Sequence, residues 1–202
     1  KDLKINDSIL YKIDSIALHA IQEKAMPGCQ VLAAKNGHVF FHKSFGNHTY
    51  DSNSIKVSNN SIYDLASITK IISSAFILMD LESKNNFNID YTLGHYLPKL
   101  LDSTEYKNLI IKDILTHQAG LVSWIPFFFK TLDDGKPSYE IYSKLPSSIH
   151  QNRVAENLYV LNSYRDTIFK RILDTKVRER KKYKYSDLGY YFVNQIIKEI
   201  TK

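Results

Sequence analysis

The sequence contains little cysteine, glycine or proline. Cys29 is the single cysteine in 202 residues, which excludes an internal disulfide framework and a cysteine-rich zinc module and leaves the redox compartment open. Seven glycines and five prolines exclude collagen-like or low-complexity character. No apolar run approaches the roughly 18 residues that span a membrane, and the opening Lys1-Asp2-Leu3-Lys4 is not the apolar region of a signal peptide. Because the chain begins with Lys1 rather than Met, we expect that residue 1 is not the native start.

The composition is that of a folded globular protein. Hydrophobic residues make up 44% and charged residues 24% of the chain, and 202 residues suffice for one domain or slightly more. The formal net charge of +6 is concentrated in Arg178–Lys184, where Tyr183 interleaves with the cations. Such a cluster can bind an anionic polymer, but it is more often a solvated surface. We therefore expect no nucleic-acid partner.

Two elements are predicted in the first 60 residues. Apolar side chains at helical spacing predict a helix over residues 8–26, ended by Pro27-Gly28. Residues 30–35 and 38–44 flank Asn36-Gly37, a dipeptide that supplies the two positive φ angles of a type I′ turn, so a hairpin is expected there. A lone hairpin is marginally stable and needs further strands or a helical layer.

The remainder is predicted to be mainly helical. The most apolar segment, residues 68–81, has apolar side chains around much of its circumference and is predicted to be a central, buried helix. Further helices are expected over residues 110–116, 157–180 and 188–201.

Ser67 and Lys70 are the first candidates for chemistry. The Ser-x-x-Lys spacing puts both side chains on one face of a helix, and the pair opens the most apolar segment. Serine is a weak nucleophile that needs a neighbouring base or cation. Burial of a lysine there is costly unless it is paired or functional, although an N-cap serine beside a solvated lysine is the simpler alternative.

Tyr185 and Asp187 are the second candidates. A tyrosine hydroxyl beside a lysine can move the proton of a serine hydroxyl. The Tyr-x-Asn/Asp spacing also occurs at Tyr106 and Tyr164, which we expect in exposed, charged segments, whereas Tyr185 comes directly before the predicted final helix.

Three segments together resemble a known family. Leu65–Lys70, Thr116–Leu121 and Tyr185–Tyr190 carry Ser-x-x-Lys, His-x-x-Gly-Leu and Tyr-x-Asp in the order seen in the class C β-lactamase-like serine hydrolases, which include D-alanyl-D-alanine carboxypeptidases and esterases. The resemblance implies that Ser67 is the acylated nucleophile, that Lys70 assists proton transfer and that Tyr185 relays protons. It also implies substrate binding by Asp187 and a structural rather than catalytic His117.

The sequence departs from the family at two points. Asp187 replaces the usual asparagine, so it lacks an amide donor for an acyl-amide carbonyl and should raise the pKa of Lys70. The later Lys-Thr-Gly or His-x-Gly strand motif is absent, since Lys35-Asn36-Gly37 precedes Ser67. We therefore expect carboxypeptidase- or esterase-like activity more than β-lactamase activity, and little turnover by these 202 residues alone.

The expected fold is α+β and β-lactamase/transpeptidase-like, with an antiparallel sheet flanked by helices plus a helical subdomain. Residues 1–202 would form its N-terminal portion, with helix and hairpin in 1–60 and the helical region in 61–202, truncated before the later strands. The alternative function is a non-catalytic module that binds cell-wall fragments or a partner domain. No cofactor or metal is expected, because the seven histidines are scattered. The resemblance implies a small-molecule or peptide substrate, a bacterial periplasmic or envelope location, and a glycoside hydrolase domain covalently attached in the full-length protein.

Overall fold

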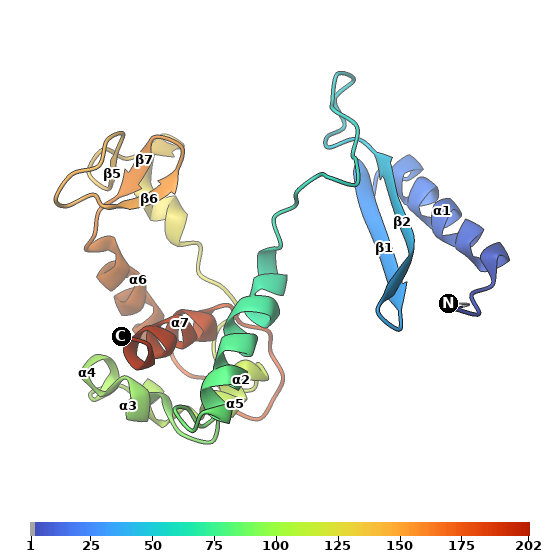
Figure 1. The fold of residues 1–202 in the computed structure, drawn as a ribbon. Coiled ribbons are helices and arrows are strands. Elements are labelled where there is room, and N and C mark those ends of the chain that lie inside the picture. Colours follow the sequence, from blue (N-terminus) through green and yellow to red (C-terminus); the bar gives the residue numbers. More distant parts are fainter. Residues whose placement is uncertain (1–2) are drawn as a thin grey trace. The chain divides into compact units, whose positions relative to one another are not determined.

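The computed structural model describes residues 3–202. These residues divide into two compact units, the first ending at Leu65 and the second running from Ala66 to Lys202. The first unit contains helix α1 (Asp7–Gln22) and the antiparallel strands β1 (Gly28–Lys35) and β2 (His38–Gly46). Figure 1 shows α1 beside this hairpin. Both turn residues have positive φ, 52° at Asn36 and 77° at Gly37, which confirms the predicted type I′ geometry.

The second unit begins with one long helical segment made of three kinds of helix. A 3-10 turn, η1 (Ala66–Ile68), leads into a π-helix, η2 (Lys70–Ala75), and then into α2 (Phe76–Ser83). The prediction of a buried helix over residues 68–81 was wrong in its burial. Leu78 and Leu81 are buried, but the apolar side chains on the remaining faces are exposed: Ile68, Ile71, Ile72, Phe76, Ile77 and Met79.

Short elements follow this segment. They are α3 (Leu93–Tyr96), α4 (Pro98–Leu101), η3 (Glu105–Asn108), α5 (Ile111–Leu115) and η4 (Phe127–Thr131). Two small sheets come next, which the sequence analysis did not anticipate: β3 (Leu132–Asp133) with β4 (Lys136–Pro137), and β5 (Tyr142–Ser143), β7 (Leu158–Val160) and β6 (Asn152–Ala155) in that spatial order.

The chain ends with α6 (Tyr164–Leu173) and α7 (Leu188–Ile200). The helix predicted over residues 157–180 is therefore wrong at both ends, because β7 occupies its start and residues 174–187 form an irregular connection, which we call the strap. α7 supplies the centre of the core with Leu188, Phe192, Val193 and Ile196, all at 0% exposure. These pack with Ile111 and Ile114 of α5 and with Tyr106 and Phe169. Figure 1 shows α7 among the other helices of this unit.

Candidate active site

Ser67 lies in η1, at the N-terminal end of the long helical segment. The first N–H groups of a helix have no carbonyl partner within it, and they form the positive end of the helix dipole. The preceding residue, Ala66, has φ of 42°, a left-handed conformation that costs a non-glycine residue roughly 1–3 kcal/mol. Positive φ at non-glycine residues is found at functional sites as well as in turns, such as the one at Asn36.

Two side chains donate hydrogen bonds to the Ser67 hydroxyl oxygen. Tyr185 Oη donates to Ser67 Oγ over 2.7 Å, and Lys70 Nζ donates to the same oxygen over 3.0 Å. The strap brings Tyr185 to a serine 118 positions earlier in the sequence. The structure thus gathers the predicted nucleophile, lysine and tyrosine around one oxygen atom.

Asp187 is the ionic partner of Lys70. The Lys70 Nζ to Asp187 Oδ1 distance is 2.6 Å, and the two side chains are 17% and 34% exposed. Burial lowers the pKa of Lys70, but hydrogen bonding to Asp187 and Tyr185 outweighs it, and the net pKa is raised. The aromatic rings of Tyr185 and Tyr190 also lie 5.3 and 5.5 Å from Nζ. Lys70 is therefore a cation at neutral pH.

The strap is fastened to the segment that follows α5. The N–H groups of Arg178, Lys181 and Lys184 donate to the carbonyls of Gly120, Gln118 and His117 over 2.8 Å each, and Asp187 N–H donates to the Ser123 carbonyl over 2.9 Å. Gly120, with φ of 78°, permits the close approach, because a Cβ there would lie 2.4 Å from the Arg178 carbonyl oxygen. These bonds fix the backbone on both sides of Tyr185.

A cavity of about 630 Å³ opens beside Ser67. α7, α6 and η2 line it with both apolar and charged side chains. The charged groups are Lys70, Arg165 and Lys198 against the single carboxylate of Asp187. Trp124, 58% exposed, also lines it. The sequence analysis missed Trp124, Arg165 and Lys198 as cavity residues. The only feature of the sequence that could have indicated this cavity is the position of Trp124, four residues after Gly120 of the His-x-x-Gly-Leu motif.

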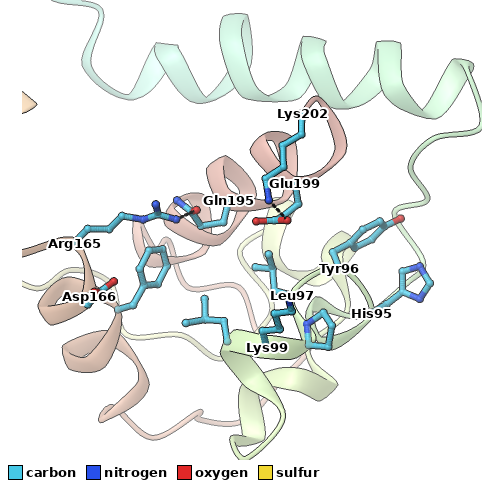
Figure 2. Close-up of a pocket in the computed structure, with 12 residues that line it drawn as sticks. His95, Tyr96, Leu97, Lys99, Arg165, Asp166, Gln195, Glu199 and Lys202 are labelled. Carbon is cyan, nitrogen blue, oxygen red and sulfur yellow. Dashed lines mark hydrogen bonds and ion pairs between the residues drawn. The ribbon is translucent and has the colours of Figure 1, made fainter. Parts of the chain in front are cut away.

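A second cavity of about 440 Å³ adjoins the first. Figure 2 shows that α3, α4, α6 and α7 contribute its lining and that Arg165 reaches from α6 to the Gln195 side-chain oxygen on α7. Arg165, Phe169 and Gln195 line both cavities and so form the wall between them. Arg165 makes no ion pair with any residue in the part of the chain that the structure describes.

The other Tyr-x-Asn/Asp sequences have structural roles. Tyr106 is 1% exposed and its hydroxyl donates to the Ile172 carbonyl over 2.8 Å, while Tyr164 is 9% exposed and donates to the Phe127 carbonyl over 2.9 Å. The expectation that both lie in exposed segments was wrong, because each tyrosine packs inward from a charged stretch. Their hydroxyls are committed to backbone carbonyls.

Much of the basic cluster Arg178–Lys184 is engaged within the chain. Lys181 Nζ contacts both oxygens of the buried Asp113 carboxylate at 2.7 and 2.8 Å, and Lys182 pairs with Glu179 at 2.8 Å. Within residues 3–202 we find no cluster of side chains suited to a metal ion and no helix long and apolar enough to cross a membrane.

Comparisons with known proteins place the chain in a family. Residues 13–202 match the family model described as Beta-lactamase. The chain belongs to the β-lactamase family. It is 28% identical over 199 residues to Protein flp of Staphylococcus aureus and 25% identical over 205 residues to a candidate D-alanyl-D-alanine carboxypeptidase of Salmonella gallinarum. The crystal structure of a class C β-lactamase superimposes with a TM-score of 0.67 at 15% identity, covering 98% of this chain and 46% of that one.

These matches establish the predicted β-lactamase/transpeptidase-like fold. They cover almost all of this chain, 98% for Protein flp and 95% for the Salmonella protein, but only 34% and 42% of those relatives. The chain therefore spans about a third of the first relative's length.

Proposed function

We propose that this chain carries the nucleophilic half of a serine hydrolase that works through an acyl-serine intermediate on a peptide, amide or ester. The observation that supports this most directly is the pair of hydrogen bonds from Tyr185 and Lys70 to Ser67 Oγ, at 2.7 and 3.0 Å. A structural serine on an exposed helix end has no need of two polar donors, one of them a lysine held in an ion pair.

Each residue then has a distinct chemical role. Ser67 Oγ attacks the carbonyl carbon and gives its proton to Tyr185 Oη, while Tyr185 passes a proton to the departing nitrogen or oxygen, so that no net charge is left on the tyrosine. Lys70 stays protonated and stabilises the negative charge that develops on Ser67 Oγ and Tyr185 Oη during proton transfer. The backbone N–H of Ser67 supplies one donor for the tetrahedral oxyanion. Water reverses the same relay to release the acyl group.

Asp187 bears on the choice of substrate. Its carboxylate is paired with Lys70 at 2.6 Å and has no N–H to offer the acyl-amide carbonyl of a β-lactam. Arg165 and Lys198 add positive charge to the cavity beside Ser67. We infer a carboxypeptidase- or esterase-like enzyme whose substrate carries an anionic group, such as a cell-wall-derived peptide, in the bacterial envelope.

Active-site labelling tests the proposal. The chain and its Ser67→Ala variant are each treated with a fluorophosphonate and, separately, with a penicillin, and adducts are found by intact-mass spectrometry. We expect one fluorophosphonate adduct that requires Ser67 and little adduct with penicillin. Ser73→Ala is the matched control, because it removes a hydroxyl from η2 that makes no contact with the site.

The outcomes separate the alternatives. Labelling that persists in Ser67→Ala would contradict the assignment of the nucleophile. Absence of any adduct, both on the folded wild-type chain and on a longer chain that includes the later strands, would favour a non-catalytic binding module instead. Equal labelling by both reagents would contradict the preference for esters and peptides.

A further inference from the structure

His117 contacts three successive residues of the strap, and the middle one is Tyr185. Its backbone carbonyl accepts the Lys184 N–H over 2.8 Å. Its ring lies against the Tyr185 ring, with centroids 4.4 Å apart and planes tilted by 36°. Its Nδ1 accepts the Ser186 N–H over 3.2 Å. No reacting atom is involved in any of these contacts.

The backbone conformation of His117 makes this possible. α5 ends at Leu115, and His117 follows in the left-handed region with φ of 57°, a common way for a helix to end. That conformation turns the carbonyl and the side chain toward the same neighbouring segment. Glycine adopts it most readily, and asparagine, aspartate and histidine adopt it more readily than other residues, so His117 is compatible with this helix end.

We propose that His117 is a positioning residue, which holds Tyr185 Oη against Ser67 Oγ by accepting the Ser186 N–H on Nδ1 and supporting the Tyr185 ring. The consequence for the reaction rests on the function proposed above, whereas the hydrogen bond itself can be measured without any activity. Tyr185 reaches Ser67 over 2.7 Å, and a displacement of about 1 Å at such a contact can lower a rate by about a hundredfold.

The arrangement requires a neutral imidazole. Nδ1 accepts a hydrogen bond only while unprotonated, so the ring proton lies on Nε2. The charged and titratable groups facing the ring are Lys70 of η2, Tyr190 of α7, and Tyr183, Lys184, Tyr185 and Asp187 of the strap. Burial, and then the positive charge of Lys70, lower the pKa of His117 and outweigh the opposing charge of Asp187. The contact is therefore present near neutral pH and is lost as pH falls below the ordinary range of histidine.

Nuclear magnetic resonance of the 202-residue chain tests the contact without reference to activity. In a pH titration we expect the Ser186 amide resonance to shift with the same midpoint as the His117 ring. In His117→Phe, which keeps an aromatic ring but has no acceptor, the Ser186 amide should exchange with solvent about tenfold faster, while the Lys184 amide, bound to the backbone carbonyl, changes less than about twofold. The proposal would be overturned if the Ser186 amide neither shifted with the titration of His117 nor exchanged faster in His117→Phe.

The rate of labelling by the fluorophosphonate tests the consequence. We expect His117→Phe to react about ten- to a hundredfold more slowly. His117→Asn, whose side-chain oxygen can accept the Ser186 N–H and does not titrate, should react within about threefold of wild type and lose the decline in rate that His117 imposes at acid pH.

The two measurements fail in different ways. If neither the wild-type chain nor a longer chain that includes the later strands carries a Ser67 adduct, but the Ser186 amide follows His117, the proposed function has failed and the contact stands. If the variants label at the wild-type rate with unchanged pH profiles, His117 does not position Tyr185. If amide chemical-shift dispersion is lost throughout His117→Phe, that variant is unfolded. The wild-type pH titration and the His117→Asn variant then test the proposal.

Discussion

The two sides of the proposed proton relay are supported very differently. The strap that carries Tyr185 is joined to the segment after α5 by backbone hydrogen bonds, and Leu188 and Phe192 just beyond it are 0% exposed. The helical segment that begins with Ser67 is supported on one face only, and Ile71 and Phe76 on its other faces are 61% and 57% exposed. One partner of the relay is thus held by backbone hydrogen bonds and core packing, whereas the other begins a helix whose apolar side chains are partly exposed.

The largest expected effect contrasts two faces of the Ser67 helix. Leu78 is 3% exposed and packs in the core, so Leu78→Ala should lower the free energy of unfolding by roughly 3 kcal/mol, the cost of lost burial plus a cavity. Ile71→Ser, at a position 61% exposed, should change it by less than about 0.5 kcal/mol. Urea denaturation followed by circular dichroism measures both. Equal losses would show that the exposed face is covered in solution.

Sequence reasoning succeeded where chemistry or local conformation decides the structure. Asn36-Gly37 specified its turn because positive φ is a property of those residues themselves. The spacing of Ser67 and Lys70 followed from helical geometry. The meeting of Ser67 with Tyr185 came from the resemblance rather than from spacing, since the two are 118 positions apart.

Sequence reasoning failed where contacts between residues distant in the sequence determine the local structure. The apolar side chains of residues 68–81 favour burial, but whether each one is buried depends on segments that are distant in the sequence. In this chain only some of these side chains are buried. Residues 174–187 continue a charged, helix-compatible pattern, yet hydrogen bonds to the carbonyls of the segment after α5 replace those of a helix. Tyr164 lies in a charged stretch and is buried because Phe127 offers its carbonyl.

A smaller effect is expected at the ion pair that holds the strap. Lys181 Nζ neutralises the Asp113 carboxylate, which is 8% exposed, so Lys181→Met leaves a buried charge without its partner and should cost about 1–2 kcal/mol of unfolding free energy. Lys182→Met removes a neighbouring lysine from an exposed pair with Glu179 and should cost less than about 0.5 kcal/mol. Thermal melts of both variants under identical buffer conditions provide the measurement. Indistinguishable melts would mean that Asp113 does not anchor the strap, and the contrast between the two sides of the relay would weaken.

The smallest expected effect concerns substrate preference in the cavity beside Ser67. Arg165 lines the cavity and keeps guanidinium donors beyond the one that it gives to Gln195, so it can bind an anionic group on a substrate acylating Ser67. Arg165→Gln should slow acylation by a p-nitrophenyl ester whose acyl chain ends in a carboxylate by about three- to tenfold, a modest change because the side chain is exposed to solvent.

The neutral ester p-nitrophenyl butyrate provides the internal comparison, because it has no anionic group for Arg165 to bind. Its rate of p-nitrophenolate release in the first turnover should be the same for wild type and Arg165→Gln. Lys170→Gln, which removes a positive charge from the same helix outside both cavities, should slow neither ester. Equal slowing of both esters by Arg165→Gln would assign Arg165 to the packing of α6 against α7. Equal slowing of the anionic ester by Lys170→Gln would assign the preference to the net positive charge of the chain rather than to the cavity.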